Sequence, residues 1–221
     1  SSAASDVYKR QIPHVTQHDK ADITKLEALR ERFGERVKAA GGKLTITAFL
    51  LKILAAALKV FPKFNASVDL AGREIIFKKY YAIGIAVDTE RGLVVPVLRD
   101  VDKKNIIQIS IELGEIARKA REGRLAPDDM QGGTFTLTNL GAIGGSFFTP
   151  IINAPEVAIL GVGRAALEPV CGKGDAVCHP RPMLPLSLSY DHRLIDGADG
   201  ARFMRWIVEA IEEPMLISLE G

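Results

Sequence analysis

The feature that most constrains the fold is a strand that runs directly into a helix near the C-terminus. Apolar side chains alternate with small or polar residues at Leu184, Leu186, Leu188 and Tyr190. This period of two is typical of a strand. The pattern breaks at Asp191-His192-Arg193, crosses Asp196-Gly197, where glycine frees the backbone to turn, and continues as a helix over about residues 198–212. The sequence therefore predicts a histidine in a loop at a strand end, a position suited to a general base, although a lone histidine is more often structural.

Helical and strand patterns are mixed along the rest of the chain. Apolar stripes predict helices over residues 24–41, 47–61 and 105–122, and the first begins with Thr24-Lys25-Leu26-Glu27, the pattern of a capping box. Shorter apolar runs predict strands, with Pro96 confining one of them to an edge or a bulge: residues 82–87, 93–98, 134–138 and 157–164. This mixture predicts an α/β fold, a two-layer sandwich in which helices pack on a mixed β-sheet.

The length suits one large folding unit over residues 12–221. The chain has 221 residues, of which 47% are hydrophobic and 25% charged, so it can bury a substantial core. Residues 1–11 lack the apolar centre of a signal peptide, and we interpret them as a disordered leader or a cloning or sequencing scar. The net charge of +2 gives no reason to expect nucleic-acid binding. The longest apolar run is interrupted by Lys52 and Lys59, so no membrane span is predicted.

The two cysteines bear on the cellular compartment. Cys171 and Cys178 flank a turn, and only His179 is close enough in sequence to join them in a zinc site, which needs four ligands. We interpret both as reduced thiols of a cytoplasmic protein. A disulfide across a hairpin is the alternative.

Two glycine-rich segments suggest nucleotide binding but lack its other requirements. Gly161-x-Gly163-x-x-Ala166 matches a dinucleotide fingerprint, which needs a helix directly after it, whereas residues 167–170 look like a strand. The turn over residues 139–146 lacks the lysine and the following helix of a phosphate-binding loop. Neither segment is expected to bind a nucleotide.

Four stretches together resemble one protein family. They are Asp191 with His192-Arg193-x-x-Asp196-Gly197, IPHVTQHDKADIT from Ile12, GIAVDTERGLVVPVLRDV from Gly84, and TLTNLGAIGGSFFTPIINAPEVAILGVG from Thr136. They resemble the catalytic domain of the dihydrolipoamide acyltransferases, the core subunits of 2-oxo acid dehydrogenase complexes, and most of all the bacterial acetyl-transferring kind. This family is similar to chloramphenicol acetyltransferase. The resemblance covers the chain from about residue 12 to its end.

The resemblance implies a reaction and three site residues. An acetyl group would pass between the thiol of a dihydrolipoyl arm and coenzyme A, a co-substrate, as in the pyruvate dehydrogenase complex. His192 would be the general base. Thr138 would stabilise the oxyanion, in place of the serine of many members, and Asp196 would orient the site through an ion pair. No metal is expected, and the basic residues that would hold the coenzyme A phosphates are not assigned.

The resemblance also implies partners in the bacterial cytoplasm. The lipoyl domain, the 2-oxo acid decarboxylating component and dihydrolipoamide dehydrogenase would bind through regions absent from this chain, which would be a core fragment. The active site would lie between the chains of a homotrimer, with His192 from one chain and Thr138 from the next. Trimers would assemble into a cubic shell of about 24 chains, held by the apolar tail at residues 214–219. Alternatives are succinyl or branched-chain transfer, acetylation of a small alcohol, or a non-catalytic core scaffold subunit.

Overall fold

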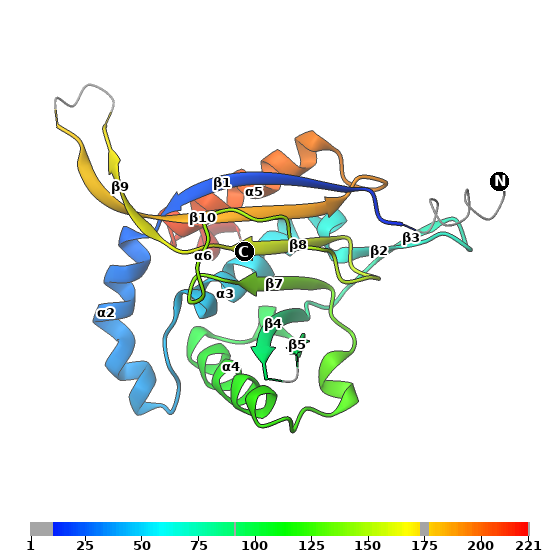
Figure 1. Ribbon diagram of the computed structural model, residues 1–221, viewed down its shortest axis with the longest axis horizontal. Coiled ribbons are helices and arrows are strands. Elements are labelled where there is room, and N and C mark those ends of the chain that lie inside the picture. The colour runs from blue at the N-terminus through cyan, green and yellow to red at the C-terminus, as the bar shows by residue number, and fades with distance from the viewer. Residues whose placement is uncertain (1–10, 91, 173–176, 221) are drawn as a thin grey trace.

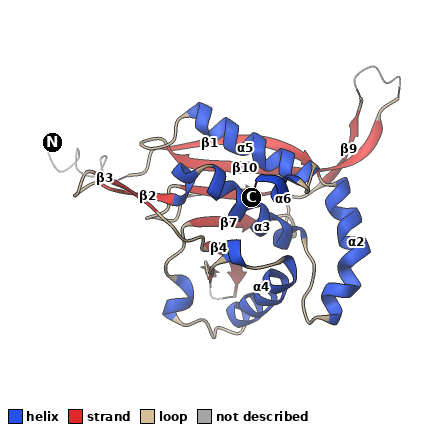
Figure 2. Cartoon of the chain, turned by 180° about the vertical axis from the view of Figure 1, so that it is seen from behind, coloured by secondary structure: helices blue, strands red, loops and turns tan. Residues whose placement is uncertain are grey.

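The computed structural model describes residues 11–90, 92–172 and 177–220. Within them a β-sheet forms one layer and helices form the other: the strands face the viewer in Figure 1, and the helices face the viewer in Figure 2. The prediction of a two-layer α/β sandwich is therefore confirmed. The prediction for residues 1–11 falls outside the described residues, apart from Gln11.

The main sheet is mixed. Its order is β1 (His14–Asp22), β10 (His179–Asp191), β8 (Ala158–Val162), β7 (Phe135–Asn139), β4 (Ile83–Thr89) and β5 (Gly92–Val94). In addition, β6 (Val97–Leu98) pairs with β4, and β9 (Ala166–Val170) pairs with β10. Strands β4, β7 and β8 are parallel, whereas β10 and β1 run antiparallel to their neighbours. The carboxyl end of β10 therefore lies at the opposite edge of the sheet from the carboxyl ends of β7 and β8.

The helices cover one face of this sheet. They are α2 (Thr24–Ala39), α3 (Ile46–Val60), α4 (Ile106–Arg121), α5 (Gly197–Glu212) and α6 (Leu216–Glu220), with short 3-10 turns η1 (Pro62–Asn65), η2 (Val101–Lys103) and η3 (Pro127–Met130). Helix α3 is buried on most sides, as its apolar sequence predicts. Phe203 of α5 stacks on Phe64 at 3.9 Å between ring centroids and lies near Phe135 of the sheet. This aromatic cluster joins the two layers in the core.

The capping box predicted at Thr24 is wrong. Helix α2 already includes Thr24, and its cap residue, Ile23, makes no side-chain hydrogen bond. Thr24 instead donates from its backbone N–H and its hydroxyl to the carboxylate of Asp22, the last residue of β1. The Asp22 carboxylate thus satisfies one of the backbone N–H groups at the start of α2, and the Thr24 side chain does not act as the cap. A capping box does occur at α4, where Asn105 and Gln108 exchange side-chain and backbone hydrogen bonds.

The prediction of reduced cysteines is also wrong. Cys171 and Cys178 form a disulfide, with their Cα atoms 4.2 Å apart. The pairing of Val170 with His179 in the β9–β10 hairpin places these cysteines opposite each other as the next cross-strand pair, a distance that a disulfide can span. The hairpin projects from the body of the molecule in Figure 1. Its strand β9 follows the glycines at 161 and 163, which agrees with the rejection of a dinucleotide site.

Two smaller features complete the fold. Strands β2 (Ala66–Asp69) and β3 (Glu74–Phe77) form a separate hairpin, which projects to the right of the main sheet in Figure 1. In the tail, Leu216 and Ile217 pack against the core, whereas the side chains of Met215 and Leu219 are exposed. Among the described residues, no helix is long and apolar enough to cross a membrane.

Candidate active site

His192 lies in a turn that is closed by an ion pair between the buried Asp191 and Arg193. Asp191, the last residue of β10, is 1% exposed, and its carboxylate accepts hydrogen bonds from Arg193 Nε at 2.9 Å, Arg193 Nη2 at 2.6 Å and the Arg193 backbone N–H at 3.0 Å. This carboxylate raises the pKa of Arg193 above its ordinary value. The backbone N–H of His192 donates to Pro13 O at 3.0 Å. The two charged neighbours thus fix the main chain on both sides of the histidine.

The imidazole of His192 is exposed. Its ring lies 6.3 Å from that of the fully buried Tyr190, with 30° between the planes. Tyr190 is backed by Gly200 of α5, where a β-carbon would come within 2.6 Å of the tyrosine ring. In the described part of the chain, the histidine ring has no hydrogen-bond partner. A ring held by its backbone and free at both nitrogens is available to take a proton from a ligand.

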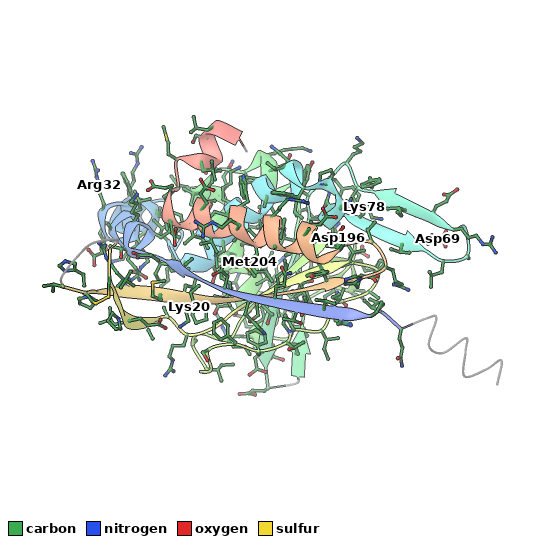
Figure 3. All side chains as sticks on the ribbon, turned by 90° about the horizontal axis from the view of Figure 1, so that it is seen from above. Lys20, Arg32, Asp69, Lys78, Asp196 and Met204 are labelled. Atoms are coloured by element: carbon green, nitrogen blue, oxygen red, sulfur yellow. A yellow bond between two sulfur atoms is a disulfide. The ribbon has the colours of Figure 1, made fainter. Side chains whose placement is uncertain are left out.

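Asp196 caps helix α5. Its side chain accepts from the backbone N–H of Asp199 at 2.8 Å, and this hydrogen bond holds the pKa of the Asp196 carboxyl below its ordinary value. Figure 3 shows Asp196 at the start of this helix. The ion pairs here belong to Asp199, with Lys63 at 2.7 Å and Arg202 at 3.3 Å. Within the described residues of this one chain Asp196 forms no ion pair, and the orienting role that the resemblance implies stays a prediction.

Thr138 lies near the carboxyl end of β7, half-buried between two strands. It pairs with Ala86 of β4 on one side and with Gly161 of β8 on the other. Asn139 follows, and its carboxamide oxygen accepts from the Gly141 backbone N–H at 2.8 Å. A side chain at position 141 would come within 2.9 Å of Gly163 O, so the turn needs glycine there. Backbone pairing, rather than side-chain contacts, positions Thr138.

The sheet does not bring Thr138 and His192 of one chain together. Thr138 is level with Gly161 of β8, and Gly161 is level with Ser187 of β10. His192 lies five residues beyond Ser187. At about 3.3 Å per residue and about 4.8 Å between strands, the two residues are roughly 17 Å apart along the sheet and about 10 Å across it. A site that uses both side chains needs a second chain.

Sequence reasoning missed two groups near this site. One is the Asp191–Arg193 pair, whose signal was opposite charges on both sides of a histidine. The other is Glu156, which is 4% exposed and lies two residues before β8. Its signal was a single acidic residue at the start of the apolar run from Val157 to Val162. No group of three or more metal-ligating side chains occurs within the described ranges.

Residues 7–219 match the model of a family described as 2-oxoacid dehydrogenases acyltransferase (catalytic domain). Over 193 residues the chain is 56% identical to the dihydrolipoyllysine-residue acetyltransferase component of the pyruvate dehydrogenase complex of Cupriavidus necator, a match that covers 87% of this chain and 34% of that protein. The corresponding Staphylococcus aureus protein is 47% identical over 213 residues, 96% of this chain and 49% of that protein. The chain thus spans about a third to a half of the curated relatives.

Solved structures resemble the fold closely. A structure of Azotobacter vinelandii dihydrolipoamide acetyltransferase, concerned with the catalytic roles of a serine, a histidine and an asparagine, superposes with a TM-score of 0.91 at 48% identity and covers 98% of this chain and 89% of its own. The cubic core of the pyruvate dehydrogenase multienzyme complex gives 0.91 at 49% identity, with the same coverage. Chloramphenicol acetyltransferase, 17% identical with a TM-score of 0.58 over 93% of this chain and 92% of its own, shares the fold. The chain therefore belongs to the family of 2-oxoacid dehydrogenase acyltransferases, as their catalytic domain.

Proposed function

We propose that this chain transfers an acetyl group between a dihydrolipoyl thiol and coenzyme A. The observation that carries the proposal is the exposed imidazole of His192, held at the end of β10 by the ion pair between the buried Asp191 and Arg193. Relatives at 47% to 56% identity are named dihydrolipoyllysine-residue acetyltransferases. An exposed histidine on a fixed backbone suits proton transfer to and from a thiol.

In the proposed reaction, His192 removes the proton of the coenzyme A thiol. Free thiols have a pKa of about 8.5 and are mostly protonated at neutral pH, whereas the thiolate is the nucleophile. The sulfur attacks the acetyl carbonyl of the S-acetyldihydrolipoyl group and forms a tetrahedral oxyanion, to which the Thr138 hydroxyl donates a hydrogen bond. The bond to the lipoyl sulfur then breaks, and that sulfur takes the proton back from His192. The products are acetyl coenzyme A and a dihydrolipoyl thiol.

We propose further that each site is shared between two chains of a homotrimer, because Thr138 and His192 of one chain lie at opposite edges of the sheet. Further assembly into a cubic core is supported by the likeness to a structure with that arrangement. The lipoyl domain, the decarboxylating component and dihydrolipoamide dehydrogenase are the proposed partners, in the bacterial cytoplasm. The spacing of His192 and Asp196 supports the site assignment, because the histidine and asparagine of the Azotobacter structure are also four positions apart.

The activity is tested by offering acetyl, succinyl and branched-chain acyl coenzyme A with dihydrolipoamide, and acetyl coenzyme A with chloramphenicol. We expect transfer to dihydrolipoamide, fastest with the acetyl donor. Preference for another acyl group would replace the acetyl assignment by one of its alternatives. Transfer to chloramphenicol alone would favour a small-molecule acetyltransferase, and no transfer at all would favour a scaffold subunit.

Sharing of the site is tested by mixing two inactive variants. His192→Ala and Thr138→Val chains are unfolded together in equal amounts, refolded and assayed. In a ring-like trimer with random composition, about a quarter of the sites pair an intact His192 with an intact Thr138, and activity should return to about that fraction. A site within one chain would give no recovery.

A further inference from the structure

Glu156 is a buried acidic residue that the proposed reaction does not use. It lies two residues before β8, is 4% exposed, and has no ion-pair partner among the described residues. Its carboxyl accepts a hydrogen bond from Thr136 Oγ1 at 2.6 Å and a second from the side chain of Asn153. Because an unpaired buried carboxylate is costly, a residue of this kind calls for a reason beyond filling space.

The backbone of Glu156 lies beside the histidine turn. The pairing of β8 with β10 continues past Tyr190 and Ala158, since the backbone N–H of Asp191 donates to Val157 O at 2.8 Å. The next residues along this register are His192 on β10 and Glu156 before β8. By this extension of the register we place Glu156 beside the main chain of His192, which is already part of the turn.

The side chain of Glu156 reaches in the other direction, to β7. Besides the bond to Thr136, its Oε1 occupies the space that a side chain at Gly133 would need, 2.7 Å from the position of that β-carbon. Thr136 and Thr138 are two residues apart on one strand, so their side chains lie on the same face. Glu156 thus contacts the same face of the strand that presents Thr138.

We propose that Glu156 is a positioning residue, which links the turn of His192 to strand β7 and thereby sets the position of the Thr138 hydroxyl. The inference rests on the proposed function. If sites are shared between chains, His192 and Thr138 of one chain belong to two different sites. The Glu156 carboxyl therefore connects the two half-sites that one chain contributes. Protonation of Glu156 would then change the position of Thr138, the oxyanion donor of one site, although Glu156 lies beside His192, the base of a different site.

The surroundings of Glu156 bring the change of its protonation state close to neutral pH. Burial raises the pKa of the Glu156 carboxyl to about 7. The charged or titratable groups on the elements around it are the Asp191–Arg193 pair and His192 on the β10 side, Arg99 near Gly132, and His14, which accepts from the backbone N–H of Ile152 in the preceding loop. Arg99 is directed to the carbonyl oxygens of Asp128 and Gln131. The loss of the proton thus leaves a buried charge beside β7, which we expect to displace the strand.

The test compares two buried threonines of this segment. Thr136→Val removes the hydroxyl that binds Glu156, whereas Thr134→Val removes an equally buried hydroxyl that donates to Ala82 O. Each variant is assayed for transfer from acetyl coenzyme A to dihydrolipoamide between pH 5.5 and 8.5, after its trimer has been verified. We expect kcat of Thr136→Val to fall about 10-fold with KM unchanged, because a small misplacement of a catalytic group is enough for such a loss. Thr134→Val should keep the wild-type kcat.

Glu156→Gln supplies the second readout. Glutamine keeps the size and the hydrogen-bonding capacity but cannot ionise, so the part of the kcat profile that changes near pH 7 in the wild type should disappear. If Glu156→Gln keeps the wild-type profile and Thr136→Val behaves like Thr134→Val, Glu156 is only structural and the inference is overturned, while the proposed function stands. A wild-type chain that transfers no acetyl group at any pH overturns the proposed function, and the inference with it.

Discussion

The two edges of the sheet hold their site residues in different ways. At the end of β10, charged side chains hold the site: the Asp191–Arg193 ion pair closes the turn, and Asp196 caps α5. The imidazole of His192 between them is exposed. At the end of β7, Thr138 is half-buried and is fixed by backbone pairing with β4 and β8. A base that exchanges protons needs a free ring on a fixed support. A hydroxyl that stabilises an oxyanion must be held in a fixed position, and backbone pairing on both sides of β7 provides this.

Removal of the imidazole should produce the largest effect. We expect His192→Ala to lower kcat by about two to four powers of ten, the usual contribution of a general base. Because the ring is exposed and has no hydrogen-bond partner in the described structure, thermal unfolding and trimer size should stay as in the wild type. A transfer assay measures kcat, thermal unfolding measures stability, and light scattering measures the size of the trimer. A variant that keeps full activity would exclude His192 as the base.

The threonine edge should respond to the loss of one hydroxyl. We expect Thr138→Val to lower kcat by about 10²–10³ with little change in KM, because an oxyanion donor acts on the transition state. Thr138→Ser is the matched control: it keeps the hydroxyl and loses only the methyl that restricts the side-chain torsion. Serine should therefore retain activity within a few-fold. Equal losses in both variants would mean that Thr138 acts through its methyl packing, not through a hydrogen bond.

The same contrast explains what the sequence alone could predict. The alternation up to Tyr190 and the break at Asp191 predicted the β10 edge, and the expected strands and helices agree with the fold, because both signals are local. The partners of side chains were harder to predict. Thr24 donates to Asp22 instead of capping helix α2, and the two cysteines form a disulfide across a hairpin. Each outcome depends on which residues the fold places opposite one another, and no short-range pattern carries that information.

Glu156, which lies between the His192 turn and strand β7, should make the stability of the fold depend on pH. Since burial raises the pKa of Glu156 from its ordinary 4.5 to about 7, the folded protein holds this proton more tightly than the unfolded chain. The stabilisation is complete below pH 4.5 and is lost as the pH rises through 7. Glu156→Gln does not titrate, so relative to this variant the wild type should lose about 3 kcal/mol of unfolding free energy between pH 4.5 and 8.

Urea unfolding at several pH values, at one fixed protein concentration, measures this difference. Glu209→Gln, at an exposed position on α5, is the control for the exchange of a carboxyl for an amide. A constant gap between wild type and Glu156→Gln across this range would show that the carboxyl of Glu156 titrates as if it were in water.

The smallest effect should come from the cap of α5. Asp196→Ala removes the acceptor for the Asp199 backbone N–H, and the loss of such a cap lowers Tm by about 2 to 4 °C in a domain of this size. Asparagine caps helices as well as aspartate does, so Asp196→Asn should restore Tm. Because the pKa of Asp196 is lowered in the fold, the difference in Tm between wild type and Asp196→Ala should decrease as the pH falls below the ordinary aspartate range. If Asp196→Asn keeps Tm but loses activity, the negative charge of Asp196 matters to the histidine turn as well as to the helix, and calorimetry beside the transfer assay separates the two roles.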